Sequence, residues 1–495
     1  MSHPADGTST AQAPGLKGRL DGYFHVSARG SDFLREIRGG LATFFAMAYI
    51  IVLNPLIIGT APDVNGDELG IARVAATTAL VGGVISILMG VVSRYPFSIA
   101  AGMGLNVLVA YSLAPKMTWA DAMGLVVLEG LVLLVLVLTG FRTAVFRAIP
   151  PNLKTAIGVG VGMFLALVGF VNAGFIRRVP DAADSTVPVQ LGDGVLTGWP
   201  ILVFVIGLVV TIALIVRRVK GAMLIGIVVA TVVAIIVEST AAVGPMAGDD
   251  GEFNPAGWSL SVPAVPTSVA DIVALPDFSL IGQFNLFGSF ANASVIAVIL
   301  LLFTLMLADF FDTMGTMVGV GGQAGLLDEK GNVPGAREVL AVDALGTMAG
   351  GAASASVNTV FAESAAGVGE GARTGIAPIV TGVLFLLATL FSPLVSLVPF
   401  EAATPVLIIV GFMMMTQVTK INFQDYAIGI PAFLTIVVMP FSYSITNGIG
   451  AGFISYTVVR IAQGRLKDIH PLMAIVAAAF LVYFAIGPIE GLLGL

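Results

Sequence analysis

One stretch of the sequence decides the fold: Gly350-Gly-Ala-Ala-Ser-Ala-Ser-Val-Asn-Thr-Val-Phe-Ala-Glu363-Ser-Ala-Ala-Gly-Val-Gly-Glu-Gly-Ala-Arg373-Thr-Gly375. It lies deep in an otherwise hydrocarbon-like chain, yet it consists mostly of small residues, lacks Leu and Ile, and carries Glu363. An ordinary membrane-spanning helix needs about 20 predominantly apolar residues. This stretch therefore has to be surrounded by protein rather than by lipid.

The composition places the whole chain in a membrane. Of its 495 residues, 57% are hydrophobic and 11% are charged, and the mean hydropathy is +0.99. Soluble domains carry about 25% charged residues. Apolar runs of about 20 residues recur from Leu41 to the C-terminus. Because these runs are continuous rather than alternating, they predict an all-α polytopic membrane protein and exclude a β-barrel.

Several classes of function lack the residues they need. The chain has no cysteine, which removes disulfides, thiolate metal sites and thiol nucleophiles. No nucleotide-binding loop or Gly-x-Ser-x-Gly elbow is present, and no histidine pairs with carboxylates at metal-ligand spacing. The net charge of −7 argues against a nucleic-acid partner. We therefore expect no enzyme, no metal and no cofactor.

Charge along the chain predicts its topology. Residues 1–30 have no apolar core and are expected to be a disordered cytoplasmic tail, and Ser31–Arg38 to be an amphipathic helix at the membrane surface. Lys and Arg cluster in the loops 142–154 and 217–220 but are absent from 221–329. Basic loops stay in the cytoplasm, so the Pro- and Gly-rich residues 238–291 are predicted to form an external loop.

That loop divides the chain into two halves, 31–237 and 292–495. Seven spans precede it, and an odd number is what an inverted repeat requires. The third segment of each half is short and interrupted: Tyr95–Tyr111 in the first half and Ser354–Gly369 in the second. Such a matched pair points to a transport site near the middle of the membrane. Periodicity does not decide which of the last three apolar runs, 425–441, 445–463 and 471–490, fully spans the membrane.

Three carboxylates lie inside predicted spans. Asp309, Asp312 and Glu363 would each cost at least about 2.5 kcal/mol if they faced lipid in the charged form. Asp309 and Asp312 are three residues apart and share a helical face, so their repulsion favours binding of a proton by one of them. These acids therefore predict substrate binding and proton coupling, with Asp312, Thr313 and Ser364 in supporting roles. The alternative is that they are neutral structural groups or face a solvated vestibule.

Other candidates flank these acids. Glu363 follows a Ser-Ala-Ser-Val-Asn-Thr run where a helix should begin, and free backbone N–H groups there favour an anion. Asn106 holds a similar place in the first interrupted segment and is either a ligand contact or a hydrogen-bonding group between helices. Phe361, two residues before Glu363, either stacks on a ligand or packs as an ordinary membrane phenylalanine.

At these residues the sequence resembles the AzgA-like purine permeases, a branch of the nucleobase:cation symporters. The matching motifs, which occur in the family's order, are Thr43-Phe-Phe-Ala-Met-Ala-Tyr-Ile-Ile-Val-Leu-Asn-Pro55, Gly102-Met-Gly-Leu-Asn106, Ile149-Pro-Pro-Asn-Leu-Lys-Thr-Ala-Ile157, Asp309-Phe-Phe-Asp-Thr-Met-Gly-Thr316 and Glu363-Ser-Ala-Ala-Gly-Val-Gly-Glu-Gly-Ala-Arg-Thr-Gly375. The resemblance implies 14 transmembrane segments in two inverted repeats of seven. It also implies a core domain, a gate domain, and short extended pieces in segments 3 and 10.

The resemblance also assigns roles. The family's substrate-binding residues fall on Asn106, Asp309 and Glu363, with Asp312 as a modulating acid, and an aromatic of related uracil carriers falls on Phe361. This chain has Val360-Phe361-Ala362 where members often have Thr-Tyr-Ile, which leaves the choice among adenine, guanine and hypoxanthine open.

The expected function is proton-coupled import of purine nucleobases by alternating access. The expected location is the cell membrane, with many spans and a cytoplasmic N-terminus. Homodimers are common among related carriers, although nothing in these residues shows one. Two alternatives remain: an anion carrier of similar architecture, such as a sulfate or bicarbonate type, and an ion channel.

Overall fold

A computed structural model describes residues 16–139, 150–179, 189–192, 194–246, 254–259, 261–292, 294–328 and 333–485. The elements up to residue 241 are α1 (Leu16–Phe24), α2 (Phe33–Met47), α3 (Ile50–Ile58), α4 (Ile71–Ser93), β1 (Ile99–Ala101), α5 (Met103–Leu108), η1 (Val109–Leu113), η2 (Ala114–Lys116), α6 (Trp119–Thr139), α8 (Pro151–Asn172), β2 (Ile176–Arg178), β3 (Val189–Leu191), α9 (Trp199–Val216) and α10 (Ala222–Ala241).

The later elements are η4 (Val269–Asp271), α11 (Ser289–Asn292), α12 (Val295–Gln323), α13 (Ala336–Ala352), β4 (Asn358–Val360), α14 (Ser364–Gly369), α15 (Ile376–Ala388), η5 (Thr389–Phe391), α16 (Ser392–Val395), α17 (Phe400–Ala403), α18 (Pro405–Met415), η6 (Thr416–Lys420), α19 (Tyr426–Phe441), α20 (Ile445–Ala462), η7 (Leu466–Asp468) and α21 (Pro471–Phe484).

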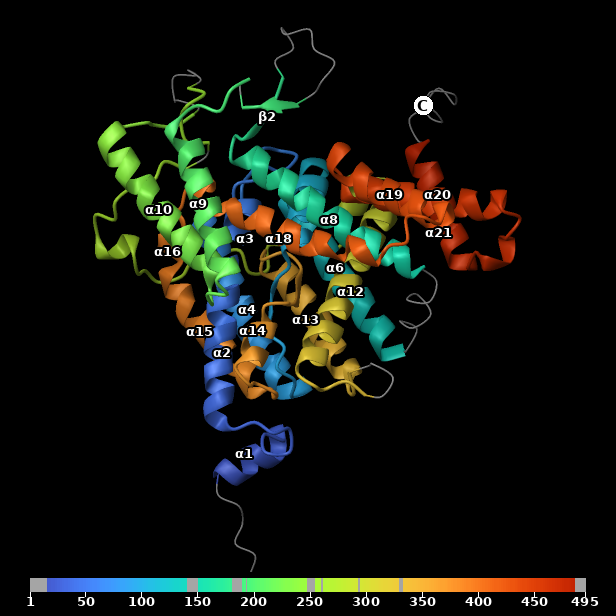
Figure 1. Cartoon of the computed structure of the whole chain (residues 1–495), viewed down its shortest axis with the longest axis horizontal. Coiled ribbons are helices and arrows are strands. Elements are labelled where there is room, and N and C mark those ends of the chain that lie inside the picture. The colour runs from blue at the N-terminus through green and yellow to red at the C-terminus, as the bar shows by residue number, and fades with distance from the viewer. Residues whose placement is uncertain are drawn as a thin grey trace, which may run out of the picture.

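Among the described residues, nine helical stretches are long and apolar enough to cross a membrane. Helices α19 and α21 are apolar but shorter than 18 residues. The protein is therefore a mostly helical, multi-pass membrane protein. In Figure 1 the N-terminal helix α1 projects from one end of the bundle, and strand β2 lies at the opposite end.

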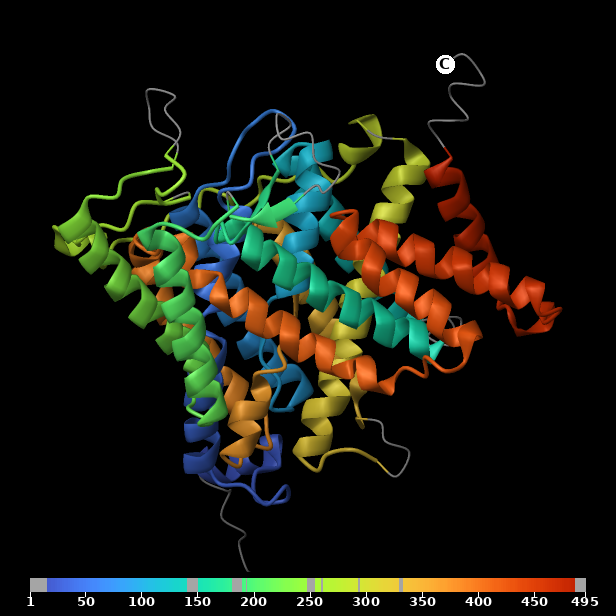
Figure 2. The same cartoon turned by 45° about the horizontal axis from the view of Figure 1, so that its top comes forward.

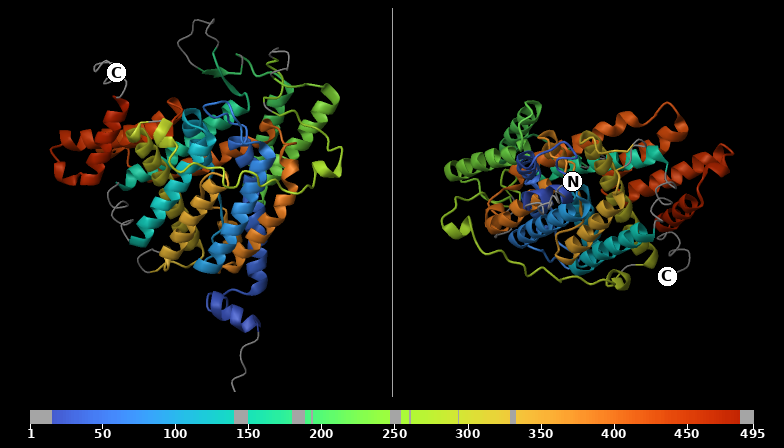
Figure 3. Two further views of the ribbon diagram at one scale, coloured as in Figure 1. Left: turned by 180° about the vertical axis from the view of Figure 1, so that it is seen from behind. Right: turned by 90° about the horizontal axis from the view of Figure 1, so that it is seen from below.

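The helices pack as two groups. In the first, α4 packs against α13 and α15, α6 against α12 and α13, and α2 against α14 and α15. In the second, α8 packs between α18 and α19, α19 packs on α20, and α9 packs on α10. Figures 1 and 2 show α9 and α10 at one edge of the molecule and α19–α21 at the other. The view from below again shows α9 and α10 at one edge and α20 and α21 at the opposite edge (Figure 3, right).

A pair of three-residue strands lies inside the first group. Strand β1 pairs with β4 in antiparallel register, with Ala100 opposite Thr359. Two flanking hydrogen bonds extend the pairing: Gly102 N–H donates to Val357 O, and Phe361 N–H to Ser98 O, each at 2.9 Å. All six strand residues are buried. Backbone groups away from water must find protein partners, and the two interrupted segments supply them to each other.

Small residues allow the chain to reach β4. A Cβ added to Gly350 would lie 2.0 Å from Ser356 O, so the end of α13 and the following turn touch through their backbones. Ser354 and Ser356 both have positive φ, 53° and 66°, and both are fully buried. Residues other than glycine rarely adopt this conformation, which is tolerated where the surrounding structure enforces it. The composition of the Gly350–Gly375 stretch thus follows from backbone proximity.

Two expectations for the N-terminal region were wrong. Residues 16–30, expected to be disordered, form α1 and a turn in which Phe24 and Val26 are buried. Tyr23 Oη donates to Val91 O at 2.9 Å and the Arg29 guanidinium donates to Arg373 O at 3.0 Å, so the end of α4 and the loop before α15 hold this segment. Residues 1–15 lie outside the described part.

The predicted surface helix is also different. Residues Phe33–Arg38 are the beginning of α2 and of the first candidate span, instead of forming a separate helix. Asp32 caps α2 by accepting from Arg35 N–H at 3.0 Å. Glu36 is fully buried and accepts from Arg373 N–H at 2.8 Å. Leu34 and Ile37 are exposed, so the residue that packs on protein at this helix end is the charged Glu36 and not the apolar side chains.

Close helix crossings predict a stability effect. A Cβ on Gly90 of α4 would lie 2.2 Å from Gly375 O. We expect Gly90→Ala to lower thermal stability, because overpacking of this kind costs about 1–3 kcal/mol. Gly369→Ala is the matched control, since its Cβ would meet open space. The measurement is thermal unfolding of both variants in detergent, and equal melting temperatures would contradict the packing described for α4.

Candidate functional site

A cavity of about 430 Å³ lies between the two helix groups. One wall comes from the interrupted segments and α12, including Gly104, Asp312 and Glu363. The facing wall comes from α8 and α18, including Val161 and Met414. Small-molecule sites are typically about 300–1,000 Å³, mostly apolar, with a few polar groups that fix orientation. The size and lining of this cavity suit a small organic ligand.

Glu363 is presented to this cavity from the start of α14. Tyr49, in the break between α2 and α3, donates its hydroxyl hydrogen to Glu363 Oε1 at 2.5 Å. A hydrogen bond from a hydroxyl to a carboxylate at this length is a strong one. The bond fixes one carboxylate oxygen and thereby sets the orientation of the other.

Phe361 also lines the cavity and is 5% exposed. Its ring centroid lies 6.4 Å from that of Tyr49, with the ring planes tilted by 47°. The two rings therefore form an aromatic corner beside Glu363. Such a corner can contact a flat ligand through a ring face or a ring edge.

The two acids of α12 occupy different environments. Asp312 lines the cavity, whereas Asp309 is fully buried behind its wall. Asp309 Oδ2 accepts a hydrogen bond from Thr347 of α13 at 3.1 Å. The two carboxylates are thus neighbours on one helix face, but only Asp312 reaches the cavity directly.

Thr313 connects α12 to a buried acid that the sequence analysis did not single out. Its hydroxyl lies 2.9 Å from both carboxylate oxygens of Asp343. Asp343 also accepts from Val360 N–H at 3.1 Å. Asp343 therefore ties α12 and α13 to strand β4, immediately before Phe361. Its position as an acid within an apolar span is the sequence signal that could have identified Asp343.

Asn106 is fully buried in α5, and neither polar atom of its side chain has a hydrogen-bond partner among the described residues. The preceding residues 103–105 line the cavity, whereas Asn106 does not. Buried amides are normally hydrogen-bonded. The amide is therefore an available donor and acceptor next to the cavity wall.

Ser364 joins the two interrupted segments rather than lining the cavity. Its hydroxyl oxygen accepts from Ser98 N–H at 3.0 Å. The structure thus brings Glu363, Phe361 and Asp312 to the cavity. It places Asp309, Asn106, Thr313 and Ser364 in the supporting layer. The sequence analysis missed Tyr49, because a tyrosine in a first span carries no signal by itself.

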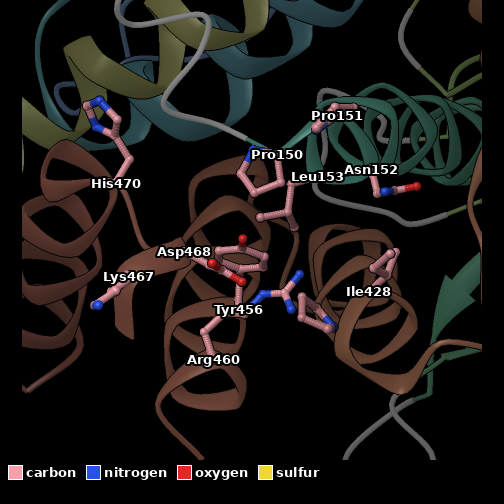
Figure 4. Close-up of a pocket in the computed structure, with 11 residues that line it drawn as sticks. Pro150, Pro151, Asn152, Leu153, Ile428, Tyr456, Arg460, Lys467, Asp468 and His470 are labelled. Carbon is pink, nitrogen blue, oxygen red and sulfur yellow. The ribbon is translucent and has the colours of Figure 1, made fainter. Parts of the chain in front are cut away.

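A second cavity, of about 440 Å³, lies where α8 begins and the α20–α21 connection passes. Arg460, Lys467, Asp468 and His470 line it, and Figure 4 shows Arg460 and Asp468 beside Tyr456. Arg460 stacks over the Tyr456 ring at 5.2 Å. None of the predicted substrate residues reaches this cavity, so the candidate site is the one at Glu363.

Comparisons with known proteins agree with a membrane carrier. The family model Xan_ur_permease, described as a permease family, matches residues 34–451. The guanine/hypoxanthine permease PbuG of Bacillus subtilis is 36% identical over 469 residues, which cover 93% of this chain and 98% of that protein. The adenine permease AdeP of Escherichia coli is 36% identical over 484 residues, covering 97% and 98% of the two chains.

A solved structure shows the same fold. The transmembrane domain of the cyanobacterial bicarbonate transporter BicA superposes with a TM-score of 0.56, covering 84% of this chain and 96% of that one. At 14% identity this likeness is one of architecture alone.

The hydrogen bond between Ser98 and Ser364, which joins the two interrupted segments, gives a second prediction. Ser364→Ala removes the acceptor for the buried Ser98 N–H, and an unsatisfied buried donor costs about 1–3 kcal/mol. We expect a lower melting temperature than for the wild type. Ser239→Ala is the control, because that hydroxyl is exposed and bonds only to Ile235 O within α10. A Ser364→Ala protein as stable as the control would show that this hydrogen bond does not hold the segments together.

Proposed function

Because the chain belongs to the permease family whose model covers residues 34–451, we propose that it is a secondary active transporter of purine nucleobases. The relatives named as guanine/hypoxanthine and adenine permeases support this substrate class. The single observation that carries the proposal is a carboxylate, Glu363, fixed by Tyr49 at the wall of an otherwise largely apolar cavity.

The chemistry of this wall suits a purine. A purine is a flat ring system with N–H donors and ring-nitrogen acceptors at its edges. Glu363 Oε1 is held by Tyr49, so Oε2 is the atom that accepts from a ring N–H. Phe361 packs against the ring, and Asn106 supplies an amide to another edge after a small adjustment of α5. Of the two α12 acids, only Asp312 lines the cavity. Asp309 therefore influences the bound purine through Asp312.

Transport follows from the position of the cavity between two helix groups. The first group, which contains the paired strands, is the core domain, and the second is the gate domain. Movement of one against the other exposes the cavity to each side of the membrane in turn, as in other carriers built from repeats. The proposal includes fourteen segments in two inverted repeats, a cytoplasmic N-terminus in the cell membrane, and the proton as the coupling ion.

An anion carrier is the second candidate, because the BicA fold supports it. Two acids, Asp312 and Glu363, line the cavity, and Lys154 is the only Lys or Arg that lines it within the described ranges. A site of this charge disfavours bicarbonate or sulfate. We therefore favour a purine carrier over an anion carrier.

Replacing the carboxylate tests the site. We expect Glu363→Gln to abolish uptake of labelled hypoxanthine, guanine and adenine, because the amide presents an N–H where the purine needs an acceptor. The loss of a charge-assisted hydrogen bond and the resulting mismatch correspond to about 1.5–3 kcal/mol or more. Glu68→Gln, which changes an exposed carboxylate in the loop between α3 and α4, is the matched control. Normal uptake by Glu363→Gln at normal surface expression would remove Glu363 from the site.

A counterflow assay tests the mechanism. Liposomes loaded with unlabelled hypoxanthine should take up labelled hypoxanthine faster than empty ones, because a carrier exchanges substrate across the membrane at each turn. A channel gives no such acceleration. Competition by sulfate or bicarbonate but not by purines would instead favour the anion carrier.

A further inference from the structure

Glu129 lies in the middle of α6 and takes no part in the site described above. It is 0% exposed, and neither of its carboxylate oxygens has a hydrogen-bond partner among the described residues. The adjacent Gly130 brings α6 into backbone contact with α13, since an added Cβ would lie 2.8 Å from Ala344 O. A long acidic side chain is therefore enclosed where two helices of the core touch.

Two acidic side chains from helices that pack on α6 act electrostatically on Glu129. The charges that act on it are those of Asp309 on α12 and Asp343 on α13. None of the described ion pairs includes Glu129. Asp121 lies eight residues before Glu129, near the start of α6. Arg337 of α13 donates to Leu138 O near the end of α6. Both are more than two helical turns from Glu129 along α6, and the described helix α6, Trp119–Thr139, contains no Lys or Arg.

These acids differ in their hydrogen-bond donors. Asp343 accepts from Val360 N–H and from the Thr313 hydroxyl, and Asp309 accepts from Thr347. Within the described ranges, neither carboxylate oxygen of Glu129 has such a donor. Burying a charge without a partner is far more costly than burying a neutral acid. A hydrogen ion is therefore the ligand that this enclosed carboxylate suits best, and the described residues contain no cluster of His, Asp or Glu able to hold a metal ion.

Helix α12 connects the surroundings of Glu129 with the cavity, because it packs on α6 and its Asp312 lines the cavity. Asp309 and Asp312 share one face of α12, one turn apart. The charge of Asp309 acts on both Glu129 and Asp312. Asp309 is therefore the acid of α12 that is electrostatically coupled to both the enclosed acid and the cavity acid.

We propose that Glu129 is the proton-binding group of the transport cycle, exchanging its proton with Asp309 and, through Asp312, with the cavity. In the transfer, the Glu129 O–H bond breaks, an O–H bond forms on the Asp309 carboxylate, and no other bond changes. The inference rests on the proposed proton symport of purines. It assigns the coupling proton to a residue that does not touch the substrate, and so separates coupling from binding within the core.

The test compares two transport modes in liposomes that contain the full-length protein. The variants are Glu129→Gln and the control Glu68→Gln. One assay measures accumulation of labelled hypoxanthine driven by an imposed pH gradient. The other measures exchange of labelled for unlabelled hypoxanthine at equal pH, in which no net proton movement is needed. We expect Glu129→Gln to lose accumulation while exchange persists, and Glu68→Gln to show both.

Each other outcome has a defined meaning. Accumulation by Glu129→Gln at the wild-type level overturns the inference. Loss of both modes in a protein with wild-type melting temperature also overturns it, because it would place Glu129 in binding or packing. A wild type that exchanges purines but responds to a sodium gradient instead of a pH gradient overturns proton symport itself. A wild type without purine transport overturns the proposed function.

A second variant covers the case in which Glu129→Gln fails to fold. Glu129→Asp keeps the acid but shortens the side chain by one methylene and thereby changes the position of the carboxyl relative to Asp309. We expect the pH profile of accumulation to shift while the profile of exchange does not. Infrared difference spectra provide an independent readout, since the carbonyl band of the protonated acid should change with the substitution. An unchanged pH profile together with an unchanged band would exclude Glu129 as the proton-binding group.

Discussion

The structure depends on one constraint: backbone N–H and C=O groups at membrane depth must be hydrogen-bonded within the protein. The pairing of β1 with β4 meets this constraint for both interrupted segments at once. It leaves the residues after each strand free to begin a short helix, and these starts carry Gly104 and Glu363 to the cavity. The position of the site is therefore a consequence of how the interrupted backbone is satisfied.

The composition of the interrupted segments was informative: small residues, glycine and an acid inside an apolar protein indicated that Gly350–Gly375 is enclosed by protein. Of the residues proposed for the site, Glu363, Phe361 and Asp312 line the cavity, and their roles stay predictions. Tyr49 was not predictable, because its role depends on a break between α2 and α3 that no turn residue marks. Glu129 and Asp343 did carry a sequence signal, since each is an acid in an apolar run. Helix α1 was missed because its stability comes from contacts with α4 and the loop before α15, which local composition does not encode.

The two helix groups differ in how they are held. Within the core, α4 meets α15 and α6 meets α13 through glycine, so that backbones touch. Packing of this kind resists deformation. The cavity lies between the groups, where α8 and α18 present Val161, Met413 and Met414. Methionine side chains adapt to changing surfaces. Under the proposed alternating access, this contrast lets the first group move as one unit while the candidate site within it keeps its geometry.

The hydrogen bond from Ser98 to Ser364 joins residues that are 266 positions apart. During synthesis, the first interrupted segment enters the membrane long before residues 358–360 exist. Its strand residues then have no backbone partner from the second half, and leaving them in lipid would cost several kcal/mol per group. The backbone pairing of the first segment can accordingly be completed only after residues 357–364 have been synthesised. Formation of the candidate site is thereby a step that needs both halves of the chain.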